Sequence, residues 1–327
     1  TQMMLRKSLP ALAAAGALSL VAVPAKAVDL TVTHWGVLMY GVPFAVAWDQ
    51  GYFAEEGIEV DGFITSQGGG TTLRNALASE VPYGETALAA VAAAAQEGLE
   101  LTIVHAGVRT VGDLLWATRS DAEEINSIED LEGRPVGYTS PRSVSQSVLY
   151  MSMDAAGIAT DDYDPRSLGG VGSGLTALDE GVVDAALVLE PVWTRLQDNY
   201  KAVFFAGDLL PPMTQTVGVV RTDYLEANPD IIRGIIKARS RGVDFIYEDP
   251  QAAGEILARV YEMDEEIAVA AVEKVAEINY WSRGDFEMDA MDNMLDGLRL
   301  VGAIDEGPFE WDELIDESYL PDDLVEQ

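Results

Sequence analysis

The chain has 327 residues and carries 55 acidic side chains against 20 basic ones, which gives a formal net charge of −35. Because such a surface repels phosphate groups, nucleic acids and anionic membranes are excluded as partners. The sequence contains no cysteine, which excludes a disulfide framework, a thiolate metal site and a cysteine nucleophile. A hydrophobic content of 48% indicates a packed core, and the length is typical of about two domains.

Residues 1–27 have the pattern of a signal peptide. The basic pair 6–7 precedes an apolar stretch at 9–23, and residues 25–27 (AKA) match the small-residue pattern of a cleavage site. The apolar stretch is shorter than the ~20 residues that a membrane-spanning helix needs. We therefore expect cleavage after Ala27 and export to the periplasm. The removed segment holds three basic residues and no acidic one, so the net charge of the exported chain would be −38.

Two parts of the remaining chain resemble each other at a nearly constant spacing. Gly36 and Gly137 each end a short β-rich run that precedes a helical stretch, and they are 101 residues apart. The ranges 67–88 and 168–187 match at the same offset. We interpret the two parts as β-α-β-α-β units. Their helix starts would face each other across a cleft, because ligands bind at the carboxyl ends of parallel strands.

The segments after the first unit complete two lobes. Strands are predicted at 99–106 and 113–118, the second of them a crossover into the second lobe. Strands at 202–205 and 216–221 flank a Pro-Pro break at 211–212, where the chain returns to the first lobe. The segments that follow are helices at 223–248, 250–261, 264–279 and 285–301, and an acidic surface tail at 305–327.

Several longer motifs occur in an order typical of one protein family. They are WDQGYFAEEGIEV (48–60), SIEDLEGRPVGYTSPRSVSQ (127–146), TALDEGVVDAALVLEPV (176–192) and ANPDIIRGIIKARSRGVDFIYEDP (227–250). The chain thereby resembles the periplasmic substrate-binding proteins of ABC importers in the nitrate/sulfonate/taurine group. These are related to binding proteins for thiamine pyrimidine precursors. The likeness covers nearly all of the chain after the predicted signal peptide, and it is much less specific for the ligand than for the family.

The resemblance implies an α/β fold with the two-lobed architecture of class II periplasmic binding proteins and two crossovers at the hinge. It implies a first lobe from 28–115 and 213–283, a second lobe from 116–212, and a C-terminal helical and acidic capping segment at 284–327. Ligand binding would close the hinge, and the closed form would dock on the membrane permease of an ABC transporter. We expect a monomer that binds a small molecule and needs no cofactor.

Glycine, hydroxyl and backbone N–H groups at helix starts are suited to hold a small ligand. The candidates of this kind are Gln67, Gly70, Thr71, Thr72, Ser140, Ser143, Val144, Ser145 and Thr214. Helix capping is the alternative role for the hydroxyl groups. Arg142 adds a fixed positive charge at one helix start, where it would hold a sulfonate, carboxylate or nitrate group; a surface position is its alternative.

Aromatic and acidic side chains give further candidates. Trp35 and Tyr40 follow the first predicted strand, and Trp116 lies at the predicted crossover. Each of the three would contact an organic ligand, with core packing as the alternative role. Glu85 and Glu190 stand beside strand ends in equivalent parts of the two lobes. In the cleft, a carboxylate would accept hydrogen bonds from an amine or amidine; on the surface it would not contact the ligand.

The sequence therefore predicts a soluble periplasmic receptor that delivers a small organic anion, of the sulfonate or carboxylate type, to an ABC transporter permease. The alternatives are a pyrimidine-type heterocycle as the ligand and a TRAP-type transporter as the partner. An enzyme on the same fold is disfavoured because no Gly-x-Ser-x-Gly, His-Glu-x-x-His or P-loop motif occurs. No metal site is expected, since His34 is better explained as a packed or hydrogen-bonded side chain and His105 has no second ligand nearby in sequence.

Overall fold

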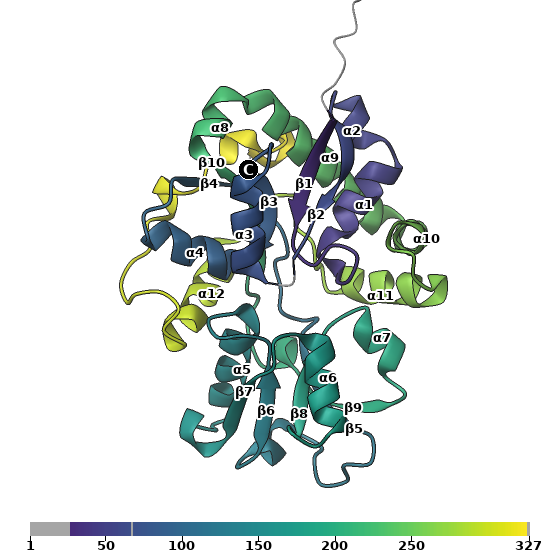
Figure 1. Cartoon of the computed structure of the whole chain (residues 1–327), viewed down its shortest axis with the longest axis vertical. Coiled ribbons are helices and arrows are strands. Elements are labelled where there is room, and N and C mark those ends of the chain that lie inside the picture. The colour runs from purple at the N-terminus through teal and green to yellow at the C-terminus, as the bar shows by residue number, and fades with distance from the viewer. Residues whose placement is uncertain (1–26, 67, 326–327) are drawn as a thin grey trace, which may run out of the picture.

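The computed structural model describes residues 27–66 and 68–325, which form two lobes, each built on a five-stranded sheet (Figure 1). The predicted signal peptide lies outside the described residues, apart from Ala27, which begins the first strand. Among the described helices, none is both long and apolar enough to cross a membrane.

The sheet of lobe 1 has the strand order β2-β1-β3-β10-β4. Its strands are β1 (Ala27–Val32), β2 (Glu59–Ile64), β3 (Tyr83–Ala87), β4 (Leu101–Ala106) and β10 (Thr216–Arg221). β1 pairs in parallel with β2 and β3, whereas β10 is antiparallel to β3 and β4. Leu30, Ile103 and Val219 are fully buried, which is typical of a sheet enclosed by helices.

The sheet of lobe 2 has the order β7-β6-β8-β5-β9, which matches that of lobe 1 strand by strand. Its strands are β5 (Leu115–Arg119), β6 (Pro135–Tyr138), β7 (Asp164–Ser167), β8 (Ala185–Val188) and β9 (Tyr200–Phe205). β6 is parallel to β7 and β8, and β5 is antiparallel to β8 and β9. The equivalence of β1, β2 and β3 with β6, β7 and β8 confirms the internal repeat that the sequence predicts.

Helices connect and cover these sheets. In the two repeated units they are α1 (Val42–Asp49), α2 (Tyr52–Glu55), α3 (Gly69–Ala78), α4 (Leu88–Gln96), α5 (Val144–Ala155), α6 (Val171–Asp179) and α7 (Val192–Leu196). After β10 they are α8 (Thr222–Ala227), α9 (Pro229–Glu248), α10 (Pro250–Tyr261), α11 (Glu265–Glu277), α12 (Met288–Leu300) and α13 (Asp322–Val325). The single helix predicted at 223–248 is two helices, because Pro229 begins a new one.

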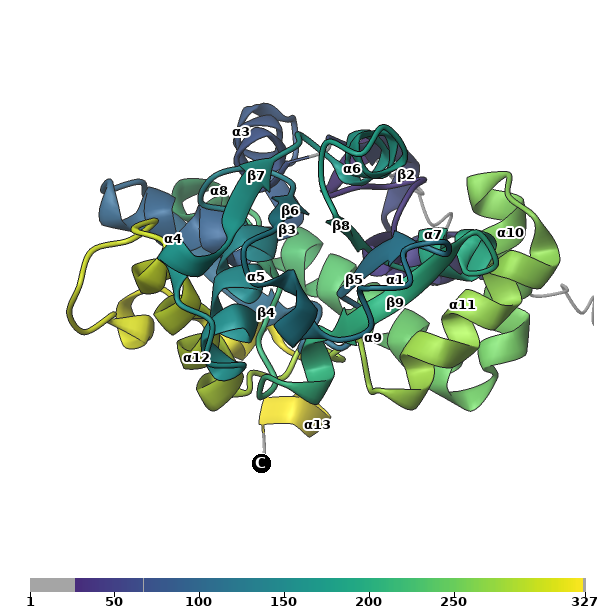
Figure 2. The same cartoon turned by 90° about the horizontal axis from the view of Figure 1, so that it is seen from below.

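Two crossovers, as the resemblance implies, join the lobes, and they lie at 107–114 and 206–215. The strand predicted as a crossover at 113–118 is instead β5, which belongs to the sheet of lobe 2. A third segment, between α11 and α12, lies beside the first crossover, where Trp281 forms an antiparallel bridge with Val108. The view from below shows α7 of lobe 2 beside α11, and α5 of lobe 2 near α12 (Figure 2). The hinge is therefore flanked by C-terminal helices that contact lobe 2.

Helix α12 packs between α4 of lobe 1 and α5 of lobe 2. Its side chains Met291, Met294 and Leu295 are fully buried. A Cβ atom on Gly297 would lie 2.7 Å from Sδ of Met151, so glycine at this position lets α5 approach closely. This part of the expected capping segment thus belongs to the core.

The acidic tail is only partly a surface segment, which differs from the expectation. Trp311, Leu314 and Leu320 are buried among the side chains of lobe 1. Ile315 forms a parallel bridge with Ile103 of β4. The tail thereby extends the edge of the first sheet, because apolar residues spaced along it bury against β4 while the acidic ones between them face water.

Candidate functional site

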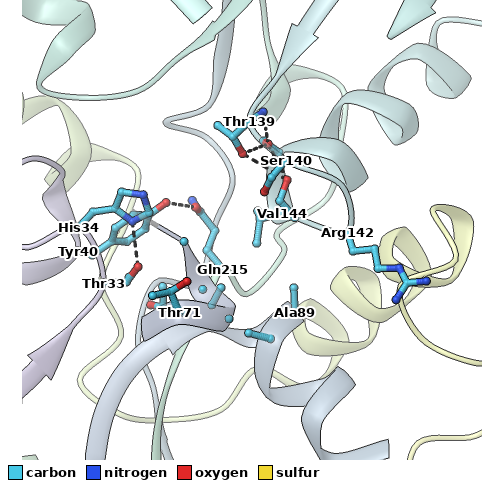
Figure 3. Close-up of a pocket in the computed structure, with 18 of the residues that line it drawn as sticks. Thr33, His34, Tyr40, Thr71, Ala89, Thr139, Ser140, Arg142, Val144 and Gln215 are labelled. Carbon is cyan, nitrogen blue, oxygen red and sulfur yellow. Dashed lines mark hydrogen bonds between the residues drawn. The ribbon is translucent and has the colours of Figure 1, made fainter. Parts of the chain in front are cut away.

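A cavity of about 550 Å³ lies between the lobes. Its walls come from the starts of α3 and α4 in lobe 1, from the starts of α5 and α6 in lobe 2, and from the loops after β1 and β6. A Cβ atom on Gly69 would lie 2.6 Å from Cβ of Ala87, so glycine lets the start of α3 lie against the end of β3. Figure 3 shows side chains from both lobes facing this space.

The cavity brings together part of the predicted site. The predicted residues that line it are Tyr40, Gly70, Thr71, Ser140, Arg142, Ser143, Val144 and Ser145. The predicted residues that do not line it are Trp35, Thr72, Glu85, Trp116, Glu190 and Thr214. Gln67 lies outside the described residues. The polar lining residues that the sequence did not indicate are Thr33, His34, Arg74, Thr139, Gln215 and Thr216.

Lobe 1 contributes an imidazole ring and a guanidinium group. Oγ1 of Thr33 lies 2.9 Å from Nδ1 of His34 in the loop after β1. One turn into α3, Arg74 donates from Nη2 to Oγ1 of Thr71 at 3.0 Å. Because residues four apart share one face of a helix, Arg74 stands on the same face as Gly70 at the cavity wall. Lobe 1 therefore brings a permanent positive charge to the site.

Lobe 2 contributes three hydroxyl groups at the start of α5. Oγ of Ser145 lies 2.7 Å from Oγ1 of Thr139 and 2.8 Å from Oγ of Ser143. The third pair, Thr139 and Ser143, is 3.4 Å apart. Three hydroxyl groups carry three protons, and the two short contacts use two of them. The remaining O–H can donate to a ligand with the loss of only a weak contact.

Three of the helices whose N-termini lie at the cavity have no side-chain cap there. These are α3, α4 and α6, whose N-cap residues are Gly68, Ala87 and Gly170. The N–H of Leu88 donates to the carbonyl of Gln215 at 2.9 Å. The other N–H groups of a first helical turn have no partner within the helix and carry partial positive charge. They are suited to an anionic group.

Tyr40 links the cavity to the hinge. Its hydroxyl donates to Oε1 of Gln215 at 2.8 Å, and Nε2 of Gln215 donates to Oδ1 of Asp113 at 2.7 Å. Nε2 also donates to the carbonyl of Thr110 at 2.6 Å, so Gln215 joins the two crossovers. Tyr280 donates to Oδ2 of Asp113 at 3.0 Å. Burial raises the pKa of Asp113 from 3.8 to about 7.

Arg142 lies at the rim of the cavity. Its backbone is left-handed, with φ of 61°, and its N–H donates to Oε1 of Gln146 at 2.6 Å. The side chain is exposed and extends away from Tyr40 and Gln215 (Figure 3). In this conformation the guanidinium group stands at the entrance and not at the inner end of the site.

Both predicted tryptophans pack inside the lobes. Trp35 stacks on Phe63 with ring centroids 3.6 Å apart. Trp116 is fully buried and stacks on Phe204 with centroids 5.0 Å apart, while its indole N–H donates to the carbonyl of Gly137 at 2.8 Å. Of the predicted aromatic candidates, only Tyr40 lies on the cavity wall.

Glu85 belongs to a buried network beneath the cavity. It accepts hydrogen bonds from Nε of Arg239 at 2.6 Å and from Oγ1 of Thr216 at 2.8 Å. Oγ1 of Thr216 accepts the N–H of Val108 in the first crossover, and Arg239 donates to the carbonyl of Ser282 at 2.8 Å. Glu85 thus organises the hinge segments around lobe 1.

The other three predicted residues that do not line the cavity are buried within the protein. Glu190 is buried and accepts the N–H of Thr194 in α7 at 3.0 Å. Thr72 is buried and donates to the carbonyl of Gly68 at 3.0 Å. Thr214 is 1% exposed in the second crossover.

Two lobes of matching strand order, two crossovers and an interlobe cavity define a protein of the periplasmic-binding-protein fold. The chain belongs to the NMT1/THI5-like family, whose sequence profile matches residues 39–253. The fold and the family group predicted from the sequence are thereby confirmed.

Known structures share this fold. The periplasmic aliphatic sulphonate binding protein SsuA from Escherichia coli has a TM-score of 0.68 and 16% identity, and the match covers 84% of this chain and 91% of that one. The periplasmic nitrate-binding protein NrtA from Synechocystis PCC 6803 has a TM-score of 0.64 and 12% identity, with coverage of 90% and 87%. At such identities the likeness shows the fold.

A curated relative is the riboflavin-binding protein RibY from Chloroflexus aurantiacus. It is 24% identical over 218 residues, which are 65% of this chain and 61% of the relative. The chain therefore matches less than two thirds of that protein's length.

Proposed function

We propose that this chain is a periplasmic solute-binding receptor that holds a small organic anion, of the sulfonate or carboxylate type, between its lobes. It delivers this ligand to the permease of an ABC importer. The charge of the cavity carries the proposal. The chain has 55 acidic residues, yet none of the described residues that line the cavity is Asp or Glu. The lining includes two arginines, Arg74 on α3 and Arg142 at the entrance.

The local groups must overcome the field of the whole molecule. A net charge of −35 opposes the approach of an anion, but salt screens charges separated by more than about 8 Å at physiological ionic strength. At the cavity wall, Arg74, whose side chain is exposed, and the uncapped starts of α3, α4 and α6 supply positive potential. A helix start contributes about 0.3–1 kcal/mol to the binding of an anion.

The remaining walls favour an organic body attached to the anionic group. Leu114, Leu187, Leu189 and Ala89 form apolar parts of the lining. A volume of about 550 Å³ falls within the range of sites for organic ligands and exceeds what an inorganic ion of a few atoms fills. Apolar surface that a ligand buries against these side chains adds roughly 25 cal/mol per Å².

Contacts from both lobes support a closing mechanism. The hydroxyl groups around Ser145 belong to lobe 2, and Arg74 and Tyr40 belong to lobe 1. A ligand that contacts both sides stabilises the arrangement in which the lobes are together. The ABC importer as the partner is supported by the family and by the sulphonate- and nitrate-binding proteins that share the fold.

A heterocyclic ligand is the second candidate. It is supported by the curated relative, which is named a riboflavin-binding protein. At the cavity wall, the rings of His34 and Tyr40 are 5.8 Å apart and tilted by 50°, and both could contact a flat ring.

A thermal-shift screen over alkanesulfonates, carboxylates, nitrate, riboflavin and pyrimidines separates the two candidates. A ligand at 100 times its Kd raises the free energy of unfolding by ~2.7 kcal/mol. We expect stabilisation by a sulfonate or carboxylate, and loss of at least about tenfold in affinity in Arg74→Gln, since a charged hydrogen bond contributes about 1.5–3 kcal/mol.

Arg195→Gln is the matched control, because it removes the same charge from an exposed position outside the cavity. Its affinity should equal that of the parent protein. Stabilisation by riboflavin or a pyrimidine alone would favour the second candidate. If no anion binds, or if Arg74→Gln binds it as well as the parent does, the proposed ligand class is wrong.

A further inference from the structure

Helix α11 of lobe 1 lies beside α7 of lobe 2 (Figures 1 and 2), and a polar contact joins the two helices outside the cavity. Nζ of Lys274 donates to Oγ1 of Thr194 at 2.8 Å. It also lies 3.5 Å from Oε1 of Glu190 and 3.5 Å from Oε1 of Gln197. None of these residues lines the cavity, so the ligand does not touch them.

The carboxylate of Glu190 depends on this contact. Its side chain is 6% exposed, and in the described part of the chain Lys274 is its one ion-pair partner within 4.0 Å. A buried carboxylate is costly unless a cation or hydrogen-bond donors compensate its charge. The compensating cation comes from the other lobe. Separating α11 from α7 would leave Glu190 with the N–H of Thr194 alone among the partners described here.

The position of Glu190 couples this contact to the site. Glu190 directly follows Leu189, which lines the cavity beyond the end of β8. Lys274 therefore fastens lobe 1 to the segment of lobe 2 that forms the cavity wall. Thr194, the nearest partner of Lys274, lies about one helical turn after Glu190, in α7.

We propose that Lys274 biases the ligand-free protein toward the arrangement in which the lobes are together, and thereby sets the ligand affinity without contacting the ligand. If a contact forms only when the lobes are together, the whole free energy of that contact favours the closed form over the open form. Lys274 is 41% exposed, so water screens its ion pair, but its bond to Thr194 is charge-assisted. We expect it to raise the closed-to-open ratio by about tenfold.

The inference rests on the proposed closing of the lobes, and its test uses no ligand. Ala78, at the end of α3, and Glu180, after α6, are exposed positions in the two lobes. The sequence contains no cysteine, so Ala78→Cys with Glu180→Cys accepts one spin label on each lobe. Electron-electron double resonance then measures the distribution of distances between the lobes in the ligand-free protein.

In the parent protein we expect a population at the short distance of the closed form. In Lys274→Met, the ratio of short to long distances should fall about tenfold, whereas Lys274→Arg should keep it. Thr194→Val removes the partner on lobe 2 and should shift the distances in the same direction. Combining Thr194→Val with Lys274→Met should add little, because both remove one interaction.

Lys237→Met is the matched control. Lys237 pairs with Glu56 at 2.8 Å, and both residues belong to lobe 1. Its distance distribution should match that of the parent protein. The inference is overturned if Lys274→Met and the parent give the same distribution, if the ligand-free parent is entirely open, or if Lys237→Met shifts the distances as much. A ligand screen that finds no anion would leave this result untouched.

Discussion

Replacing Asp113 with Asn should make the protein more stable at alkaline pH. Asp113 lies in the first crossover, is 5% exposed and forms no ion pair within the described residues. It accepts hydrogen bonds from Gln215 and Tyr280. Asn can keep both contacts, because its carbonyl accepts from Gln215 and its amide donates to the hydroxyl of Tyr280. The substitution therefore removes a charge without leaving a gap.

The magnitude follows from the pKa of Asp113, which burial raises from 3.8 to about 7. Between these values the folded state holds a proton that the unfolded chain has lost, so its stability falls as the pH rises. The contribution is fully present below about pH 4 and is lost as the pH rises through 7. Roughly three pH units at 1.36 kcal/mol each amount to about 4 kcal/mol.

Urea denaturation of the parent and of Asp113→Asn at about pH 4, 6 and 8 tests this reasoning. The 55 acidic residues make both stability curves depend on pH, but the difference between them isolates the one carboxyl. The variant should gain about 4 kcal/mol relative to the parent between pH 4 and 8. A difference that stays within about 1 kcal/mol over this range would show that Asp113 is not buried in the way described here.

Three further substitutions test the packing around the site. Glu85→Gln should lower the free energy of unfolding by about 3–5 kcal/mol, because it leaves the buried guanidinium of Arg239 uncompensated; a loss below about 1 kcal/mol in urea denaturation would contradict this. Gly297→Ala should lower the free energy of unfolding by about 1–3 kcal/mol through overpacking against Met151, and the higher helix propensity of Ala should offset about 1 kcal/mol of this loss. A net gain in stability would argue against the close approach of α5. Trp116→Phe should lower the free energy of unfolding by about 1–3 kcal/mol, because it leaves the carbonyl of Gly137 without the indole N–H. Calorimetric titration should give an unchanged ligand affinity, and weaker binding would place the indole in the site.

Helix starts could be predicted from the sequence because glycine and hydroxyl residues mark them. Thr71, Ser143 and Ser145 fall on the cavity wall for this reason. Arg74 was missed because its role depends on the face of α3 that it shares with Gly70, one turn past the glycine and threonine residues that mark the helix start. A motif fixes where a helix begins more clearly than which later residues turn toward the cleft.

The orientation of side chains on buried strands could not be predicted from the sequence. Trp116 lies in β5, an inner strand of the lobe 2 sheet, where apolar residues occupy both faces and no alternation tells one from the other. The partners of Glu85 and Glu190 are Arg239 and Lys274, which lie far along the chain. Such pairings follow from the packing of helices after β10 onto both lobes, and local sequence does not encode them.

The strand order has a consequence for how the chain folds. All five strands of lobe 2 come from one continuous stretch, 115–205, so this sheet can assemble from neighbouring segments alone. In lobe 1 the late strand β10 lies between β3 and β4, which both precede lobe 2 in sequence. The first sheet therefore has to wait for residues 216–221, and its inner position stays vacant while they are absent. Since distant pairings form slowly, lobe 2 should complete first and lobe 1 should be the slower half.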